Sequence, residues 1–421
     1  MRLFCAADLH LGRVPSRLPA DLPLAEADLG PTAAWHALVD ACLDEGADAL
    51  LLAGDLIDDE RDLFGSFADL ESGLRRLDQA GIPVVAVAGN HDVRSLPRLA
   101  AALPNLRQLG RGGHWEAADL GGPGTPVRLV GWSFPDVHVT GSPLDAPGRE
   151  LLERDDVPTI GLLHADLDAG GGRYAPVASA DLAATAVDVW LLGHVHVPSD
   201  FAAGLHAGYL GSLAAVDPGE TGPRGAWLLT LEGGDLRFER RALAPLRYLT
   251  VRCDVDGADP DDALARVTAS VREAAFGDDP ARATAIRLHV RGRVSDPAEV
   301  RRALTFDPDT PWTLEQDGRY AFVHDLVTSV SFRHDLTRLA RLDDPIGVAA
   351  RTLLQLRDPD APEHAALLAS ARDRLAAVGR RSAFRTLDPP RPSDDELRDR
   401  LDRATLRVLD ELLASRDRSE R

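Results

Sequence analysis

The sequence contains no lysine, so all 47 of its basic side chains are arginine. Its three cysteines, Cys5, Cys42 and Cys253, lie far apart and form no Cys-x-x-Cys pair. This pattern disfavours a disulfide framework or a thiolate zinc site, and we expect reduced, buried thiols. No apolar run approaches the ~18–20 residues that span a bilayer, and the first residues lack the apolar stretch of a secretion signal. We therefore expect a cytoplasmic protein that makes no membrane contact.

Acidic side chains outnumber basic ones by 67 to 47, which gives a net charge of −20. A uniformly cationic surface that coats nucleic acid is therefore excluded, although a local basic path is not. The excess lies mainly in residues 1–200, which carry 30 acidic and 14 basic side chains, against 37 and 33 in residues 201–421. The length predicts on the order of two or three domains, at about 150 residues each.

Short apolar runs alternate with helical patterns in the first half of the chain. The predicted strands are Arg2–Ala7, Ala49–Ala53, Pro83–Ala88, Val127–Trp132, Thr159–Leu163, Val187–Leu192, Leu205–Leu210, Ala226–Leu231 and Leu236–Arg241. Helices are predicted over Ala33–Glu45 and Leu63–Ala80. Continuous apolar strands between helices are typical of sheets that are buried on both faces. We therefore expect a two-sheet α/β sandwich.

A second pattern of predicted strands and helices begins at Ala244-Pro245. Strands over Tyr248–Val255, Ala285–Val290 and Tyr320–Phe332, with a helix over Pro260–Ala275, predict a small α+β domain. After His334 the pattern is helical to the end.

The last helix is predicted by a capping box, because Ser393 is followed three residues later by Glu396. We expect it to end near Leu413. Its expected apolar stripe consists of Leu397, Leu401, Ala404, Val408 and Leu412. Such a helix serves either as a packed terminal element or as a helix that docks a partner.

Five short motifs with oxygen or imidazole donors each follow a predicted strand. They are Asp8-Leu9-His10, Gly54-Asp55-Leu56-Ile57-Asp58, Gly89-Asn90-His91-Asp92, His164 and Gly193-His194-Val195-His196. Each motif alone is common turn or surface chemistry, but strand ends at one edge of an α/β sheet form ligand sites. The donor types suit Mn²⁺, Fe²⁺ or Zn²⁺ better than Ca²⁺, and a carboxylate bridges two such ions best. The ordered set therefore predicts a metal site.

The ordered set resembles the calcineurin-like metallophosphoesterase family over about residues 1–242. The resemblance implies two divalent ions, with Mn²⁺ as the expected metal. The residues implied to hold them are Asp8, His10, Asp55, Asn90, His164, His194 and His196. Asp55 would bridge, with Asp8, His10 and His196 on one ion and the other three residues on the second.

The same resemblance implies the catalytic roles of two neighbouring residues. A water activated by both ions would attack phosphorus in line, and His91 would protonate the leaving oxygen or stabilise its developing charge. Asp92 would orient His91. The role of Asp58 stays open between supporting His91 and supporting the metal ligands.

Finer motifs resemble the SbcD and YhaO type of DNA repair exonuclease. They are Tyr174-Ala175-Pro176, Gly211-Ser212 and Glu220-Thr221-Gly222-Pro223-Arg224-Gly225. This resemblance implies a nuclease domain over residues 1–242, a capping and DNA-binding α+β domain over 247–332, and a helical region over 333–421. It also implies that the C-terminal helices dock a coiled-coil SMC-like ATPase, and that helices of the nuclease domain form a homodimer.

The expected function is a metal-dependent exonuclease that acts on DNA ends in repair. Two other classes stay open. One is a small-molecule phosphatase or cyclic-nucleotide phosphodiesterase with an unrelated C-terminal extension. The other is a binding module that keeps the metal site only as a scaffold, and the complete ligand set argues against it.

Overall fold

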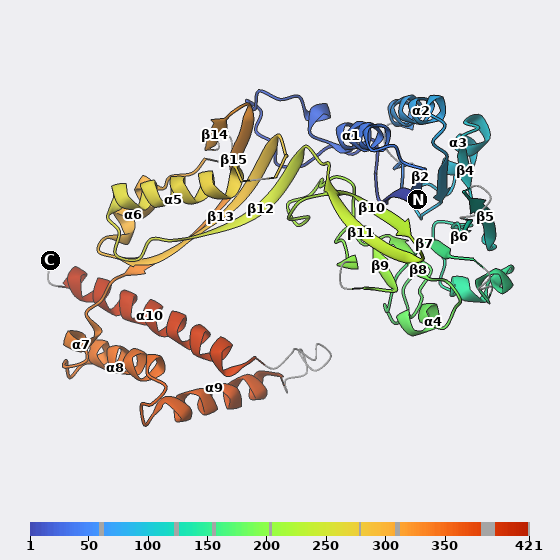
Figure 1. The fold of residues 1–421 in the computed structure, drawn as a ribbon. Coiled ribbons are helices and arrows are strands. Elements are labelled where there is room, and N and C mark those ends of the chain that lie inside the picture. Colours follow the sequence, from blue (N-terminus) through green and yellow to red (C-terminus); the bar gives the residue numbers. More distant parts are fainter. Residues whose placement is uncertain are drawn as a thin grey trace. The chain divides into compact units, whose positions relative to one another are not determined.

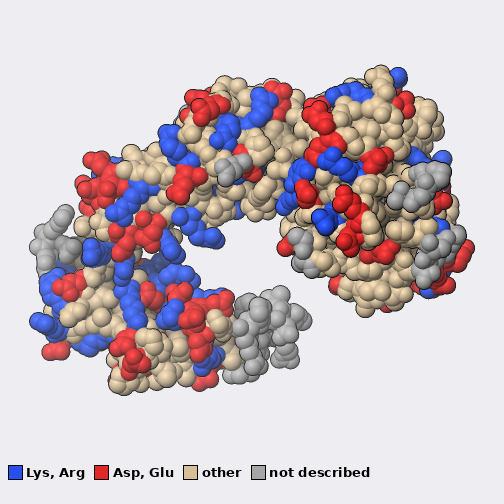
Figure 2. Space-filling model, in the orientation of Figure 1, with Lys and Arg blue, Asp and Glu red and all other residues tan. Residues whose placement is uncertain are grey.

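The computed structural model describes residues 1–58, 63–121, 126–153, 157–201, 204–277, 279–307, 312–379 and 392–419. The chain forms two compact units. The first comprises Met1–Val251, Val271–Leu288 and Phe306–Leu326, and the second comprises Arg252–Ser270, His289–Thr305 and Val327–Arg421. Arginine and carboxylate side chains are interspersed on the face drawn in Figure 2.

A mixed six-stranded sheet forms one layer of the first unit (Figure 1). In spatial order its strands are β11 (Asp235–Ala242), β10 (Gly225–Glu232), β1 (Arg2–Ala6), β2 (Ala49–Ala53), β3 (Val84–Val87) and β4 (Leu106–Gln108). Strands β1 to β4 run parallel, and β10 and β11 pair antiparallel at the other edge. Every residue of β2 and β3 is buried, which explains why both strands read as continuous apolar runs.

A five-stranded sheet forms the second layer. Its strands, in spatial order, are β5 (Glu116–Leu120), β6 (Val127–Trp132), β7 (Thr159–His164), β8 (Val189–Gly193) and β9 (Ala207–Tyr209). Strands β6 to β9 are parallel, and only the pair β5–β6 is antiparallel.

The two sheets face each other across one apolar layer. Leu3, Leu51 and Val85 of the first sheet belong to the same buried cluster as Leu129 and Leu162 of the second. Helices packed on the outer face of the first sheet are α1 (Pro31–Asp44), α2 (Leu63–Gln79) and α3 (Leu96–Ala102). Helix α4 (Ser179–Ala183) packs on the outer face of the second. These layers confirm the predicted two-sheet α/β sandwich.

A third sheet follows the sandwich in the sequence. Its spatial order is β12 (Leu246–Asp254), β13 (Ala283–Val294), β15 (Arg319–Phe332) and β14 (Thr313–Gln316). Helices α5 (Pro260–Ala275) and α6 (Pro297–Ala303) lie between its strands in the sequence. Along β12, Val251 and Cys253 are buried whereas Arg252 and Asp254 are exposed. The alternation leaves one face of this sheet open to solvent.

The last part of the described chain is helical, as predicted. Its helices are α7 (Leu336–Leu339), α8 (Pro345–Arg357), α9 (His364–Gly379) and α10 (Asp394–Ser419). The capping box is present, because Ser393 Oγ accepts a hydrogen bond from the Glu396 N–H (3.3 Å) and Glu396 Oε2 accepts one from the Ser393 N–H (2.8 Å). Helix α10 continues to Ser419, beyond the predicted end near Leu413.

The buried side of α10 differs from the predicted stripe. Leu406 and Leu409 pack in one cluster with Ile346 and Leu353 of α8, whereas Val408 is 51% exposed. Of the expected apolar stripe, Leu397 is buried and Leu412 packs against this cluster, whereas Ala404 and Val408 are exposed. The helix meets α8 along a neighbouring row of leucines with the same three- and four-residue spacing, and both rows are apolar in the sequence.

Three strands escaped prediction, namely β4, β5 and β14. All three lie at sheet edges and are short, so they carry little hydrophobic pattern. The three cysteines are free and buried, as expected. Among the described helices, none combines the length and hydropathy needed to cross a bilayer.

Candidate metal centre

The five predicted motifs come together at one end of the two facing sheets. They begin at, or within two residues of, the C-terminal ends of β1, β2, β3, β7 and β8. Because neighbouring strands among these are parallel, their C-terminal ends share an edge. Ligand atoms of Asp8, Asp55 and His164 accordingly lie within 4.8 Å of one another.

The backbone at these strand ends is left-handed at four predicted site residues. Their φ angles are 51° at Asp8, 47° at His10, 54° at Asp55 and 103° at His194. Such angles cost about 1–3 kcal/mol each outside glycine and concentrate at functional sites. Hydrogen bonds from Asp8 N–H to Gly54 O and from His10 N–H to Asp55 O, both 3.0 Å, hold the first two loops together.

Glycines of the motifs are required by the close packing of backbone against site side chains. A Cβ at Gly89 would lie 2.2 Å from Asp55 Oδ1. A Cβ at Gly193 would lie 2.0 Å from Ala53 O and 2.7 Å from His164 Nδ1. Any larger residue would displace a predicted metal ligand, which explains the Gly-Asn-His-Asp and Gly-His-x-His patterns.

His164 directs an unprotonated ring nitrogen toward two side-chain oxygen atoms. Its Nδ1 lies 3.0 Å from Ala53 O, which can only accept, so Nδ1 carries the proton. Its Nε2 then directs a lone pair toward Asn90 Oδ1 at 3.2 Å and Asp55 Oδ2 at 3.4 Å. Burial lowers the pKa of His164, so the ring is neutral at pH 7. Lone pairs gathered in this way fit a cation.

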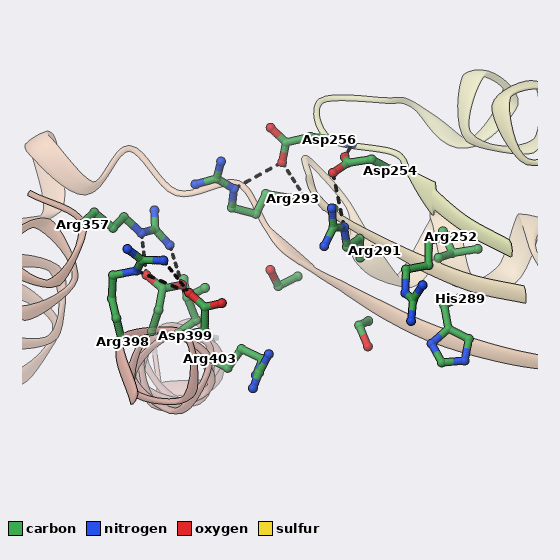
Figure 3. Close-up of a pocket in the computed structure, with 16 residues that line it drawn as sticks. Arg252, Asp254, Asp256, His289, Arg291, Arg293, Arg357, Arg398, Asp399 and Arg403 are labelled. Atoms are coloured by element: carbon green, nitrogen blue, oxygen red, sulfur yellow. Dashed lines mark hydrogen bonds and ion pairs between the residues drawn. The ribbon is translucent and has the colours of Figure 1, made fainter. Parts of the chain in front are cut away.

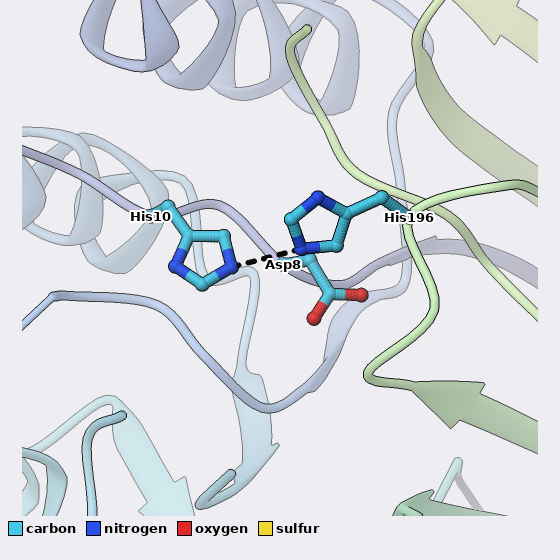
Figure 4. Close-up of side chains that lie close together, drawn as sticks. All are labelled: Asp8, His10 and His196. Carbon is cyan, nitrogen blue, oxygen red and sulfur yellow. Dashed lines mark hydrogen bonds between the residues drawn. The ribbon is translucent and has the colours of Figure 1, made fainter. Parts of the chain in front are cut away.

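Asp8, His10 and His196 form a second group of donors (Figure 4). Their ligand atoms lie within 4.8 Å of one another, and the Nε2 atoms of His10 and His196 are 3.1 Å apart. His196 Nδ1 pairs with Glu220 Oε1, which leaves its Nε2 lone pair directed toward His10. Burial lowers the pKa of His10 to about 3, so this ring is also neutral at pH 7.

One carboxylate oxygen of Asp55 lies close to both groups of donors. Its Oδ2 lies 3.4 Å from His164 Nε2 and 3.9 Å from His10 Nε2. Its other oxygen accepts a hydrogen bond from the His91 N–H at 2.9 Å. This position between the groups is the one that a bridging carboxylate needs.

The charges of the two buried carboxylates are not balanced by arginine. Burial, together with the charge of Asp55, raises the pKa of Asp8 to about 7. Burial also opposes ionisation of Asp55, but His164 and His10 outweigh it and its pKa falls below the usual range. Within the described residues, the basic side chains within 4.0 Å of these carboxylates are histidines only, and His10 and His164 are neutral at pH 7. The two clusters are therefore consistent with a dinuclear metal site.

His194 stands beside these clusters rather than within them. Its Nε2 lies 2.9 Å from Asp166 Oδ1, and its backbone N–H donates to both carboxylate oxygens of Asp8 at 3.1 Å. Its ring centroid is 5.2 Å from that of His164. Its role as a metal ligand stays a prediction.

His91 borders the site with a partly exposed ring. Its Nδ1 is 3.5 Å from Asp58 Oδ1, and Asp58 Oδ2 accepts a hydrogen bond from Arg13 Nε at 2.7 Å. His10, Asp58 and His91 form a further group within 4.8 Å, but Arg13 already compensates the charge of Asp58. Of the two roles left open for Asp58, the geometry favours supporting His91.

Asp92 is fully buried and ties two loops together. Its Oδ2 accepts a hydrogen bond from the Leu56 N–H and its Oδ1 accepts one from the Gly89 N–H, both at 2.8 Å. These bonds join the second motif to the third. That Asp92 also orients His91 stays a prediction.

Three residues at the site were not assigned a role from the sequence. Asp166 contacts His194, Glu220 contacts His196, and Arg224 donates hydrogen bonds to the backbone oxygens of His196 and Thr221. Asp166 follows His164, the last residue of β7, by two residues, so its closeness in sequence could have indicated it. Glu220 and Arg224 belong to a motif that carried the resemblance, but its spacing does not reveal which histidine it contacts.

Residues 1–198 match the calcineurin-like phosphoesterase family. This part of the chain is a calcineurin-like metallophosphoesterase domain. Two curated proteins show distant homology to the chain. The YhaO metallophosphoesterase of Bacillus subtilis is 27% identical over 252 residues, 56% of this chain and 58% of that protein. The DNA double-strand break repair protein Mre11 of Haloferax volcanii is 29% identical over 325 residues, 71% of this chain and 65% of that protein.

The alignments thus cover about three fifths of the length of these relatives. Among solved structures, that of TT1561 from Thermus thermophilus is 16% identical, with a TM-score of 0.35. That alignment covers 56% of this chain and 97% of that one.

The raised pKa of Asp8 predicts that metal binding to the phosphoesterase domain releases a proton. A carboxylate ligand must be ionised, whereas Asp8 with a pKa of about 7 is half protonated at pH 7. His196, whose pKa is raised by its bond to Glu220 against the effect of burial, acts in the same direction. We expect proton release with Mn²⁺ to increase as the pH falls through about 7 and to vanish near pH 8.5. Calorimetric titration in buffers of different ionisation enthalpy measures it, and pH-independent release would contradict the expectation.

Glu220 is expected to strengthen metal binding by orienting His196. Because the Glu220 carboxylate fixes the His196 tautomer, Glu220→Gln should weaken Mn²⁺ affinity by about 10–100-fold. Titration of free Mn²⁺ by electron paramagnetic resonance gives the affinity without relying on activity. Glu232→Gln, at the exposed end of β10, is the matched control. Equal Mn²⁺ affinity in the two variants would show that Glu220 does not support metal binding.

Proposed function

We propose that the chain is a metal-dependent phosphodiesterase that acts as an exonuclease on DNA ends in DNA repair. The observation that carries the proposal is the gathering of carboxylate and imidazole donors around Asp8 and Asp55 in a metallophosphoesterase domain. The Mre11 alignment supports DNA as the substrate, because its 325 residues exceed the 198 residues of the family match. The similarity therefore continues beyond the phosphoesterase domain.

In this proposal the seven predicted ligands hold two Mn²⁺ ions. Asp55 would contribute to both sites. Asp8, His10 and His196 would complete one site, and Asn90, His164 and His194 would complete the other. Bound ions of this kind supply Lewis acidity and activate a water for in-line attack on phosphorus. The chain contributes the neutral imidazoles and the positioned carboxylates that such ions require.

His91 is the proposed general acid. Its backbone N–H bond to Asp55 fixes its Cα beside the donors, and its side chain is 36% exposed, so a substrate reaches it. Asp58 faces Nδ1, which leaves Nε2 for the sugar oxygen that departs. Arg13 in turn holds Asp58 in place. This chain of contacts orients a proton donor toward the leaving group.

The C-terminal helices are proposed to dock a coiled-coil SMC-like ATPase. A groove between α8 and α10 is lined by Val348, Ala349, Val408 and Leu412, and Val348 and Val408 are more than half exposed. An apolar groove of this kind suits the apolar face of a partner helix. We further propose that residues 247–332 cap the nuclease domain and contact DNA, and that helices of the nuclease domain form a homodimer.

A substrate panel separates this function from its alternatives. We expect Mn²⁺-dependent hydrolysis of bis(p-nitrophenyl) phosphate and of a labelled DNA duplex, with little hydrolysis of p-nitrophenyl phosphate or cyclic AMP. Hydrolysis of cyclic AMP without attack on DNA would support a cyclic-nucleotide phosphodiesterase. Hydrolysis of the monoester alone would support a phosphatase, and Mn²⁺ binding without any hydrolysis would support a binding module.

A further inference from the structure

A cleft in the second unit brings an open sheet face opposite α10. It has a volume of about 720 Å³ and is lined by β12, β13 and β15 on one side and by α8 and α10 on the other (Figure 3). Six arginines and four aspartates line it, although the whole chain carries a net charge of −20. None of the metal-centre residues lies in this unit.

Each lining aspartate is paired with a lining arginine. On the sheet, Arg291 Nε lies 3.6 Å from Asp254 Oδ2, and Arg293 Nε lies 3.2 Å from Asp256 Oδ1. On the helices, Arg357 bonds both oxygens of Asp402 at 2.6 and 3.1 Å. Arg398 Nη2 lies 3.1 Å from Asp399 Oδ1. The negative charges of the cleft are therefore compensated within it.

Two arginines remain after this pairing. Arg252 comes from the exposed face of β12 and Arg403 from α10, so they stand on opposite walls of the cleft (Figure 3). Within the described part of the chain, neither forms an ion pair or a side-chain hydrogen bond. Two uncompensated guanidinium groups facing one cavity make it attractive to an anion.

The rest of the lining adds hydrogen-bonding groups. Ser329 and Ser331 of β15 line the cleft, and their hydroxyl groups make no hydrogen bond within the described residues. His289 Nε2 is buried there without a partner among these residues. Phenylalanine, tyrosine and tryptophan are absent from the residues that line the cleft. Guanidinium and hydroxyl donors bind phosphate oxygens, whereas recognition of a nucleobase commonly uses an aromatic face.

We propose that this arginine cleft binds the sugar–phosphate backbone of a nucleic acid strand, with Arg252 and Arg403 as the phosphate contacts. The lack of a stacking residue favours a strand held by its phosphates over a free nucleotide held by its base. Such contacts are independent of sequence and sensitive to salt. The choice of nucleic acid rests on the proposed function, but binding at the cleft requires no catalysis by the chain.

Fluorescence anisotropy of the full chain with a labelled 30-nucleotide poly(dT), in EDTA at several salt concentrations, tests the inference. We expect the Arg252→Gln, Arg403→Gln double variant to bind at least about tenfold more weakly, because two charge-assisted contacts are lost. The slope of log affinity against log salt should become shallower by about 1.4, since each single-strand phosphate contact contributes about 0.7. Arg407→Gln, exposed on the same helix but outside the cleft, should bind like the unmodified chain.

Competition identifies the form of phosphate that the cleft takes. Unlabelled poly(dT) should displace the probe at far lower phosphate concentration than dTMP or inorganic phosphate. Equal displacement by dTMP would overturn the assignment of a strand, and unchanged affinity and salt slope in the double variant would overturn the site.

Hydrolysis measured in parallel keeps this inference separate from the proposed function. Loss of binding in the double variant, with no DNA hydrolysis by the unmodified chain in Mn²⁺, would sustain the cleft and refute the nuclease. Robust DNA hydrolysis by the unmodified chain, together with unchanged binding in the double variant, would sustain the nuclease and refute the cleft. Circular dichroism checks that the variants fold, which we expect because both side chains lack partners within the described residues.

Discussion

Replacement of Asp55 by asparagine is expected to lower Mn²⁺-dependent hydrolysis of DNA by about 10³-fold or more, equivalent to about 4 kcal/mol. The same oxygen of Asp55 faces His164 on one side and His10 on the other. Loss of its charge therefore weakens both proposed ion sites at once. Asparagine keeps the acceptor for the His91 N–H, so the loop should hold its position. Steady-state rates and Mn²⁺ titration of the same preparation measure the effect.

The thermal stability of this variant gives a second readout. Without metal, Asp55 and Asp8 repel each other in a buried setting, and this repulsion helps to raise the pKa of Asp8. This repulsion is outweighed by the interactions that lower the pKa of Asp55, so its charge contributes to stability at pH 7. Asp55→Asn should therefore be somewhat less stable than the unmodified chain in EDTA, and should gain little from added Mn²⁺. Asp181→Asn on the exposed side of α4 should behave like the unmodified chain. A normal Mn²⁺ response in Asp55→Asn would contradict the bridging role.

Replacement of His91 by alanine is expected to slow cleavage of DNA by about 10²–10⁴-fold, the usual contribution of general acid catalysis. Mn²⁺ affinity should be unchanged, because His91 is not among the proposed ligands. The loss should be smaller for bis(p-nitrophenyl) phosphate, since p-nitrophenolate leaves without protonation whereas a sugar oxygen does not. Rates on both substrates, with Mn²⁺ affinity measured alongside, test this expectation.

The pattern of losses distinguishes the roles of His91. An equal loss on both substrates would assign His91 to charge stabilisation rather than to proton donation. Full activity on DNA would remove it from the mechanism. Asp58→Asn should reduce DNA cleavage in the same substrate-dependent way, but to a lesser extent, because it acts through the His91 ring.

The sandwich and the place of the site were accessible from the sequence because they rest on strong local signals. Strands such as β2 and β3 are buried on both faces, so their sequences are continuous apolar runs. The motif residues follow these runs directly, and parallel strands bring such ends together. Gly89 and Gly193 mark the same sheet edge in the sequence, because a side chain at either position would clash with Asp55 or His164.

Features that depend on contacts distant in sequence were not accessible in the same way. The pairing of Glu220 with His196 and of Asp166 with His194 follows from how loops cross the site, and no spacing rule fixes it. Two neighbouring rows of apolar residues on α10 could each have formed its buried side. Only the contact with α8 identifies the row that contains Leu409 as the buried one. The arginine cleft likewise combines strands and helices that lie far apart in the chain.

The most direct test of the central claim is digestion of end-labelled single- and double-stranded DNA by the purified chain in Mn²⁺, with EDTA and the Asp55→Asn variant as controls. The account predicts metal-dependent shortening of the DNA from its ends, which EDTA and the variant abolish. Intact DNA under conditions where the same preparation binds Mn²⁺ and hydrolyses small phosphoesters would contradict it.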